Sequence, residues 1–256
     1  MDLEKQILES YETIMAGLPR VGQLRFGRKM VRVSDIAKQY YCERALELSY
    51  LKPLPQTKRM AEGEKGHAAI SSTAKPMTHE EAVKEAIQPR KKPFCLYEFN
   101  IAWLSKDVPI VGNVDEAWFR QGNIDLVVER KFTNKLDVYS SYHIQAQLYC
   151  LGLGEMGFNN TNTQYRIALM KRSCHDCIEL SALTCPTITC EAEYHSCSKG
   201  ESKAFVFPFE RKPVIIDLEW ALDFWVGQRD AVPTTNRAKC NSCSYKTSCE
   251  NSLVTQ

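Results

Sequence analysis

The sequence lacks any apolar run long enough to span a membrane, and residues 1–10 lack the basic start and apolar core of a signal peptide. It also lacks an excess of either charge, because 33 Lys and Arg residues stand against 31 Asp and Glu residues, for a net charge of +2. This balance does not by itself indicate a nucleic-acid-binding protein. We therefore expect a cytoplasmic protein with no membrane partner.

Apolar side chains and cysteines, by contrast, are plentiful. The chain has 256 residues, of which 44% are hydrophobic and 25% charged, which excludes a disordered protein and suffices for one large domain or one domain with an appendage. In a reducing compartment, its eleven cysteines argue against a disulfide scaffold and favour metal or cluster ligation.

Residues 111–132 predict a β-hairpin around which the rest of the chain is organised. Glu129 and Lys131 are two residues apart and share one face of the second strand. A loop of Gln121, Gly122 and Asn123, with Asn123 in the left-handed region, pairs Arg120 with Ile124 and sets Asp115 opposite Glu129. A two-residue loop at 122–123 would instead set Asp115 opposite Arg130, on the wrong side of the sheet.

Two carboxylates held side by side in an apolar sheet repel each other, so a divalent cation between them is the best explanation for the pair. A lysine two residues beyond could orient a metal-bound water or stabilise the charge on a phosphate. This arrangement indicates phosphodiester hydrolysis. A solvated hairpin with an ordinary Glu129–Lys131 pair is the alternative, because the pattern is short and common.

Four motifs follow one another in the chain: Gly66-His67, Gly112 to Asp115 (GNVD), Glu129 to Lys131 (ERK) and Gln145-x3-Tyr149. The series resembles the RecB-like branch of the PD-(D/E)xK nucleases. The resemblance implies an α/β fold with a restriction-endonuclease-like core, in which a mixed sheet is flanked by helices. It also implies that Mg²⁺ or Mn²⁺ is held by His67, Asp115, Glu129 and the carbonyl of Arg130. Lys131 would position the attacking water, and Gln145 and Tyr149 would steady the DNA strand.

A second signal is the cysteine layout, in which Cys42 stands alone near the N-terminus and Cys240-x2-Cys243-x5-Cys249 closes the chain. Spacing alone suits either zinc or a [4Fe-4S] cluster. The layout extends the resemblance to iron-sulfur members: the CRISPR-associated RecB-like nuclease of spacer acquisition, AddB-type nuclease domains and exonuclease V. The resemblance covers roughly residues 31–172 and 204–250. It implies a [4Fe-4S] cluster that joins residues 31–55 to residues 229–256.

Residues 1–30 are expected to be an N-terminal helical extension, and residues 173–203 a cysteine-rich insert that the resemblance does not cover. Cys174-x2-Cys177 is a good half-site for a structural zinc, with Cys185 and Cys190 as further ligands. No second C-x2-C motif follows it within the insert. A reduced, partly ordered hairpin extension without metal, or cysteines that pair only during purification, therefore remain the alternatives.

Periodicity and capping signals predict the other elements. Helices are expected over 3–17, from Ser34 as N-cap to about 50, and over 60–71, 78–87, 140–152 and 213–228. Strands are expected over 94–104, 163–171 and 204–209, the last two as partners.

The function that the resemblance implies is a metal-dependent exonuclease acting on single-stranded DNA or DNA ends in CRISPR spacer acquisition, alongside the integrase complex. A stand-alone repair nuclease like exonuclease V would share the same residues. An alternative of another class is a non-catalytic DNA-binding adaptor stabilised by a cluster or by zinc.

Overall fold

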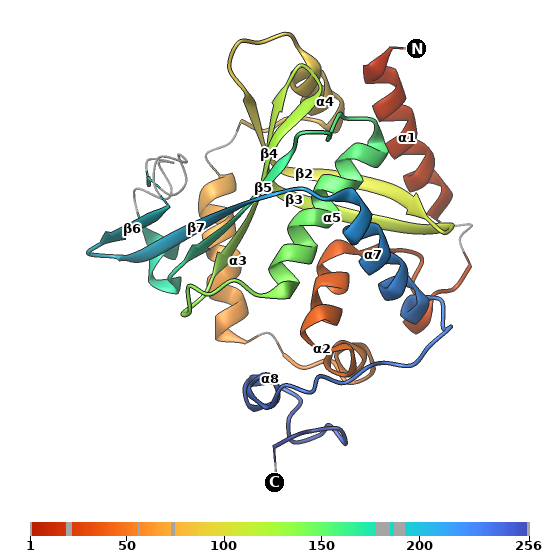
Figure 1. The fold of residues 1–256 in the computed structure, drawn as a ribbon, viewed down its shortest axis with the longest axis vertical. Coiled ribbons are helices and arrows are strands. Elements are labelled where there is room, and N and C mark those ends of the chain that lie inside the picture. The colour runs from red at the N-terminus through yellow and green to blue at the C-terminus, as the bar shows by residue number, and fades with distance from the viewer. Residues whose placement is uncertain are drawn as a thin grey trace.

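Alternating apolar and polar residues in the middle of the chain form a mixed sheet flanked by helices, so the fold is α/β, as expected (Figure 1). The computed structural model describes residues 2–18, 22–55, 57–72, 75–177, 185–186 and 193–254. In this part of the chain the sheet has seven strands, in the order β1-β3-β4-β5-β7-β6, with β2 also paired to β3. The strands are β1 (Val31–Arg32), β2 (Phe94–Ser105), β3 (Val108–Arg120), β4 (Asn123–Phe132), β5 (Gln164–Met170), β6 (Tyr194–Cys197) and β7 (Gly200–Pro208).

The predicted helices are present, with small differences at their ends. They are α1 (Leu3–Gly17), α2 (Val33–Leu51), α3 (Lys58–Ser71), α4 (His79–Ile87), α5 (Ser140–Met156) and α7 (Arg211–Trp225). A further short helix, α8 (Arg237–Ser242), was not predicted. The side chains of Thr78 and Glu81 form a capping box at the start of α4. The prediction of Ser34 as N-cap is wrong, because Arg32 holds that position and caps the helix without a side-chain hydrogen bond. None of the described helices combines the length and apolar character needed to cross a membrane.

The β3–β4 hairpin reaches the expected register by a different route. The predicted three-residue loop is wrong: Arg120 pairs with Asn123, and the turn residues Gln121 and Gly122 both have positive φ, as a tight two-residue turn requires. The register then shifts between Trp118 and Phe119, which leaves Asp125 as an extra residue on β4. With the short turn alone, Glu129 would lie on the opposite face of the sheet from Asp115. The bulge shifts the pairing by one residue and puts both on the same face.

The long strand β3 has two edges, and β2 occupies the whole of one. Strands β1 and β4 must therefore share the other edge, where β1 pairs with Ile110 and Val111 and β4 pairs from Glu116 onward. Residues 112–115, the GNVD motif, lie between these two partners. The sheet thus opens at this motif.

The segment that leads to the C-terminus lies against α2, next to Cys42 (Figure 1). Glu43 is almost fully buried, and its carboxylate accepts hydrogen bonds from Arg229 Nη1 and Nη2, each at 2.6 Å. The backbone N–H of Val232 donates to the same carboxylate at 2.8 Å. Removing one partner of such a buried pair typically costs about 3–5 kcal/mol, so these contacts hold residues 229–232 firmly against α2.

Candidate active site and cysteine pockets

Three carboxylates form a row across three neighbouring strands. On β2, the pairs Tyr97–Glu116 and Phe99–Val114 set Glu98 opposite Asp115. On β4, continuing one step beyond the pair Glu116–Val128 sets Glu129 opposite Asp115. Asp115 and Glu129 thus lie opposite each other on one face of the sheet, as the hairpin analysis required. Glu129 is not part of the close group of ligand atoms that Asp115 forms with His67 and Glu98.

The ladder between β3 and β4 ends where the row crosses it. The backbone N–H of Arg130 donates to Asp115 Oδ2 at 2.8 Å, so a side chain replaces the next backbone partner. The Arg130 guanidinium forms a fully buried ion pair with Glu116. Since Glu116 and Arg130 alternate with Asp115 and Glu129 along their strands, this ion pair lies on the other face of the sheet. The role expected for the Arg130 carbonyl remains a prediction.

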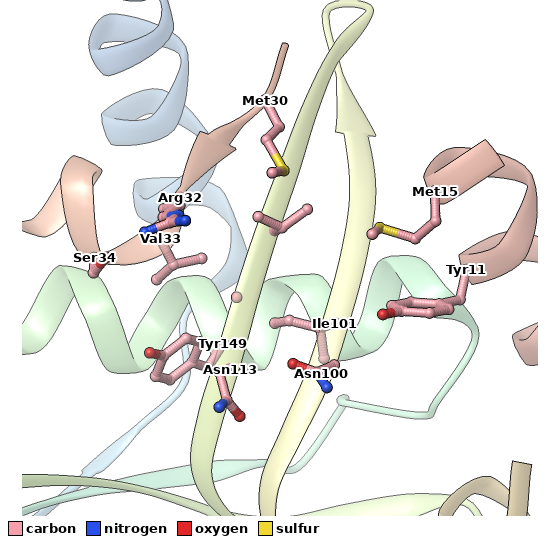
Figure 2. Close-up of a pocket in the computed structure, with 12 residues that line it drawn as sticks. Tyr11, Met15, Met30, Arg32, Val33, Ser34, Asn100, Ile101, Asn113 and Tyr149 are labelled. Carbon is pink, nitrogen blue, oxygen red and sulfur yellow. The ribbon is translucent and has the colours of Figure 1, made fainter. Parts of the chain in front are cut away.

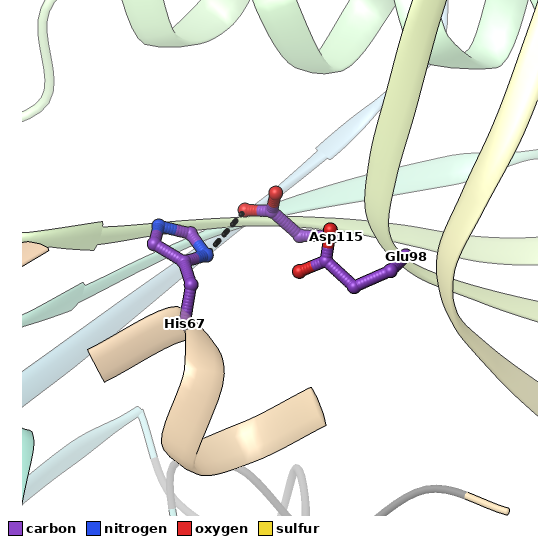
Figure 3. A group of neighbouring side chains, drawn as sticks. All are labelled: His67, Glu98 and Asp115. Carbon is purple, nitrogen blue, oxygen red and sulfur yellow. Dashed lines mark ion pairs between the residues drawn. The ribbon is translucent and has the colours of Figure 1, made fainter. Parts of the chain in front are cut away.

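His67 on α3 completes a compact group with Asp115 and Glu98 (Figure 3). Its Nδ1 atom lies 3.7 Å from Asp115 Oδ2, and one ligand atom from each residue falls within 4.8 Å of the others. In the described part of the chain, no other three His, Cys, Asp or Glu residues are gathered this closely. One imidazole and two carboxylates suit a divalent cation.

Gly66 allows α3 to approach the sheet closely enough to place His67. A Cβ atom on Gly66 would lie 2.3 Å from the ring of Phe132 on β4, a distance that real Cβ atoms do not adopt. The same ring packs against His67, with centroids 5.6 Å apart. The lack of a side chain at Gly66 is therefore needed for packing, in addition to the metal-binding role expected of His67.

Glu129 is completely buried, and neither of its carboxylate oxygens accepts a hydrogen bond, although Lys131 Nζ forms an ion pair with Oε1. Burial and the neighbouring Asp115 raise the pKa of Glu129 to about 8. For Glu98, burial and Asp115 raise the pKa to about 7, while a hydrogen bond from Asn113 opposes the shift. Two carboxylates whose pKa values are raised by burial, and which lie beside Asp115, fit a site for a cation.

Lys131 connects this row to α5. Its Nζ donates to Gln145 Oε1 at 3.0 Å, and Gln145 Nε2 donates to the Tyr149 hydroxyl at 3.0 Å. The structure thus brings together the ERK and QxxxY motifs, which the resemblance placed at one site. Burial lowers the pKa of Lys131, but Glu129 and Asp115 outweigh it, so the pKa is raised and the lysine stays charged. A charged lysine can stabilise developing negative charge but cannot accept a proton.

Glu98 is the site residue that sequence reasoning missed. It has a left-handed backbone, with φ of 52°, inside an otherwise extended strand. Such strain in a residue other than glycine costs about 1–3 kcal/mol and is concentrated at functional sites. The available signal was chemical: Glu98 is the one charged residue in the apolar segment 94–104.

Two cavities adjoin the site. One, of about 410 Å³, is lined by Asn113 and Tyr149 from the site and by Tyr11, Met15 and Arg32 from the N-terminal segments (Figure 2). The other has a volume of about 610 Å³. Its lining includes four tyrosines and three basic residues: Tyr40, Tyr41, Tyr139, Tyr142, Lys135, Arg172 and Lys239. Lys131 lies beside it, with its Nζ 5.5 Å from the centroid of the Tyr142 ring. Aromatic rings interleaved with cations are typical of surfaces that bind single-stranded nucleic acid.

Cys42, Cys240, Cys243 and Cys249 line one pocket, although 198 positions separate the first two. Cys42 leaves the helical conformation within α2, and its Sγ accepts a hydrogen bond from the N–H of Thr234 at 3.4 Å. Among the described residues, no three cysteine Sγ atoms lie within 4.8 Å of one another. The structure thus brings the four cysteines of the predicted cluster to one pocket.

The insert contains a second cysteine pocket. Cys174, Cys177, Cys185 and Cys197 line it, the first three being buried. Burial and the three other thiols raise the pKa of Cys174 to about 11. Cys190, which the sequence analysis included in a possible zinc site, lies outside the described residues. Cys197, not included in that prediction, is present in the pocket.

Comparisons with known proteins leave the family open. No protein-family model matches the chain, and no curated protein matches it. A solved structure titled "Crystal structure of SSO0001" is similar over 99% of this chain and 98% of its own, at 11% sequence identity and a TM-score of 0.49. A likeness this distant carries no argument about function.

Proposed function

We propose that this protein is a metal-dependent deoxyribonuclease that hydrolyses phosphodiester bonds in single-stranded DNA or at DNA ends. The observation that carries the proposal is the row of Glu98, Asp115 and Glu129, with His67 above it and Lys131 beside it. Its support from sequence is the order of the four motifs, which resembles that of RecB-like PD-(D/E)xK nucleases.

The residues of the row would hold Mg²⁺ or Mn²⁺, with His67 as the nitrogen ligand. The ion, when bound, supplies a Lewis acid that polarises the scissile phosphate and activates water. Lys131 remains protonated because of its acidic neighbours, so its proposed role is to stabilise negative charge on the phosphate and to orient the water. Gln145 fixes the ammonium group through its hydrogen bond and is itself fixed by Tyr149.

A single strand is the proposed substrate because both adjoining cavities suit one. The cavity of about 610 Å³ extends from the neighbourhood of Lys131 to Tyr41 and Lys239, which also line the pocket of Cys42. We propose that this pocket holds a [4Fe-4S] cluster that fixes the wall of the DNA path. By resemblance, the proposed setting is the trimming of DNA ends beside a CRISPR integrase complex.

The direct test is digestion of end-labelled single-stranded DNA in Mn²⁺, with EDTA as a blank and two Asp→Asn variants of one hairpin. Asp115→Asn should reduce cleavage at least about 100-fold, since it removes a metal ligand. Asp125→Asn is the matched control, because Asp125 forms a partly exposed ion pair with Arg120 at 2.9 Å on the same hairpin and should keep activity.

Two outcomes would reject the proposal. Cleavage that persists in EDTA would show that no divalent cation is needed. DNA binding without cleavage by the wild type, in any divalent metal, would instead support a non-catalytic adaptor.

A further inference from the structure

The four cysteines of the insert pocket come from three separate segments, and local structure explains how each arrives. Cys174 lies in a 3-10 helix, η3 (Arg172–Asp176), and Cys177 directly follows it. In a 3-10 helix, residues three apart are eclipsed, so these two side chains lie on the same side. The N–H of Cys177 donates to the carbonyl of Cys174 at 3.0 Å, which closes this turn.

The short hairpin of β6 and β7 brings Cys197 to the same place. Cys197 pairs with Gly200, the residue that begins β7. A Cβ atom on Gly200 would lie 2.9 Å from Cys174 Sγ and 2.8 Å from Ser173 Oγ. A glycine at this position therefore lets the hairpin and the 3-10 helix approach each other until Cys174 and Cys197 line one pocket.

Packing alone does not explain four thiols here. A single buried cysteine behaves as a small apolar residue, as Cys150 does in the main core. In the insert, by contrast, Cys174, Cys177, Cys185 and Cys197 share one small pocket, and these four are free thiols. Four convergent thiols from a C-x2-C turn, a loop and a hairpin are the ligand set of a thiolate metal site.

We propose that Cys174, Cys177, Cys185 and Cys197 form a second metal centre, distinct from the pocket of Cys42, that binds a thiophilic metal as zinc or as iron in a cluster. Four thiolates are the shared chemistry of both. A zinc ion would draw the sulfurs to roughly 3.8 Å from one another, whereas a cluster would hold them further apart.

The position of this centre suggests what it stabilises. Cys174, Cys177 and Cys185 pack in a small apolar cluster with Ile70 of α3 and Phe132 of β4. Phe132 is the ring against which Gly66 and His67 rest. A metal at this centre would therefore hold the insert against the helix that carries His67.

The test is metal analysis of the full-length chain, purified without oxygen from cells supplied with zinc and iron. In Cys174→Ser and Cys197→Ser, the metal content per chain should fall below that of the wild type by the content of one centre. In Cys95→Ala, on β2, it should not change. Loss of zinc identifies a single-ion site, and loss of iron with sulfide identifies a cluster. Full retention of metal in Cys174→Ser and Cys197→Ser would overturn the proposal.

Cys190→Ser decides the ligand set. Metal loss in Cys190→Ser with full retention in Cys197→Ser would reject the set that the structure assigns. To separate loss of metal from loss of folding, the wild type is also alkylated in its native state and mapped by mass spectrometry. The four pocket thiols should become reactive together only when a chelator removes zinc or an oxidant removes a cluster. If they react at the rate of Cys95 without such treatment, no metal protects them and the centre does not exist.

Discussion

The Asp115 carboxylate accepts a hydrogen bond from the backbone N–H of Arg130 at the point where strands β3 and β4 part. This contact orients Asp115 without using the guanidinium, which pairs with Glu116 on the other face of the sheet. Asp115 is thereby held in its place in the row, between Glu98 on β2 and Glu129 on β4. The following predictions test the site built around it.

Glu98→Gln should weaken Mn²⁺ binding by about 10-fold or more, because it removes one carboxylate from the group formed with His67 and Asp115. Cleavage should recover in part at high Mn²⁺, since the other ligands remain. Isothermal titration and the metal dependence of cleavage measure both effects. Glu155→Gln, which only breaks a surface pair with Arg211, is the control. Equal Mn²⁺ affinity in the two variants would remove Glu98 from the site.

Lys131→Ala should reduce the cleavage rate by at least about 100-fold, because a charge next to the phosphate is lost. Binding of single-stranded DNA and the visible absorbance of a cluster should change little, since the lysine lies away from the pocket of Cys42. Lys106→Ala, whose ammonium group pairs with Glu219 and Asp223 on the surface, should behave as the wild type. Full activity of Lys131→Ala would contradict the assigned role.

Gly66→Ala should destabilise the protein by about 1–3 kcal/mol and weaken metal binding, because its Cβ would overlap the Phe132 ring and push α3 outward. Gly63→Ala is a matched control on the same helix. Nothing lies within 4 Å of a Cβ at position 63, so this change should stabilise the helix by roughly 0.5–1 kcal/mol. Denaturant unfolding of both variants measures the difference, and similar effects of the two would refute the packing argument.

The metal-free protein should become less stable as the pH rises from about 5 to 8. The pKa values of Glu129 and Glu98 are raised from 4.5 to about 8 and about 7, so the folded protein binds protons that the unfolded chain has released. Stability therefore falls with rising pH in this window. The thermal midpoint should drop by a few degrees, and stabilisation by Mn²⁺ should grow over the same range. Glu129→Gln should flatten the pH dependence, and an unchanged slope in that variant would count against the assignment.

Sequence reasoning predicted most helices, the hairpin and the nearness of Asp115 to Glu129, because these depend on local periodicity, capping and strand alternation. It missed Glu98, because a glutamate in an apolar segment does not predict a left-handed backbone within a strand. It did not include Cys197 in the insert pocket, because spacing along the chain does not show that Gly200 admits a close approach to Cys174. It also gave the wrong turn and no bulge, and these two errors cancelled in the final register.

That cancellation has a consequence for how the site is specified. With a two-residue turn alone, regular pairing would put Asp115 and Glu129 on opposite faces of the sheet. The extra residue at Asp125 shifts the pairing by one residue and puts both on one face. A chain of the same length that paired regularly from this turn, with Asp125 opposite Trp118, would set Asp115 opposite Val128 and turn Glu129 and Lys131 to the other face. The chemistry of this hairpin thus depends on the pairing of its strands as much as on the identity of its residues.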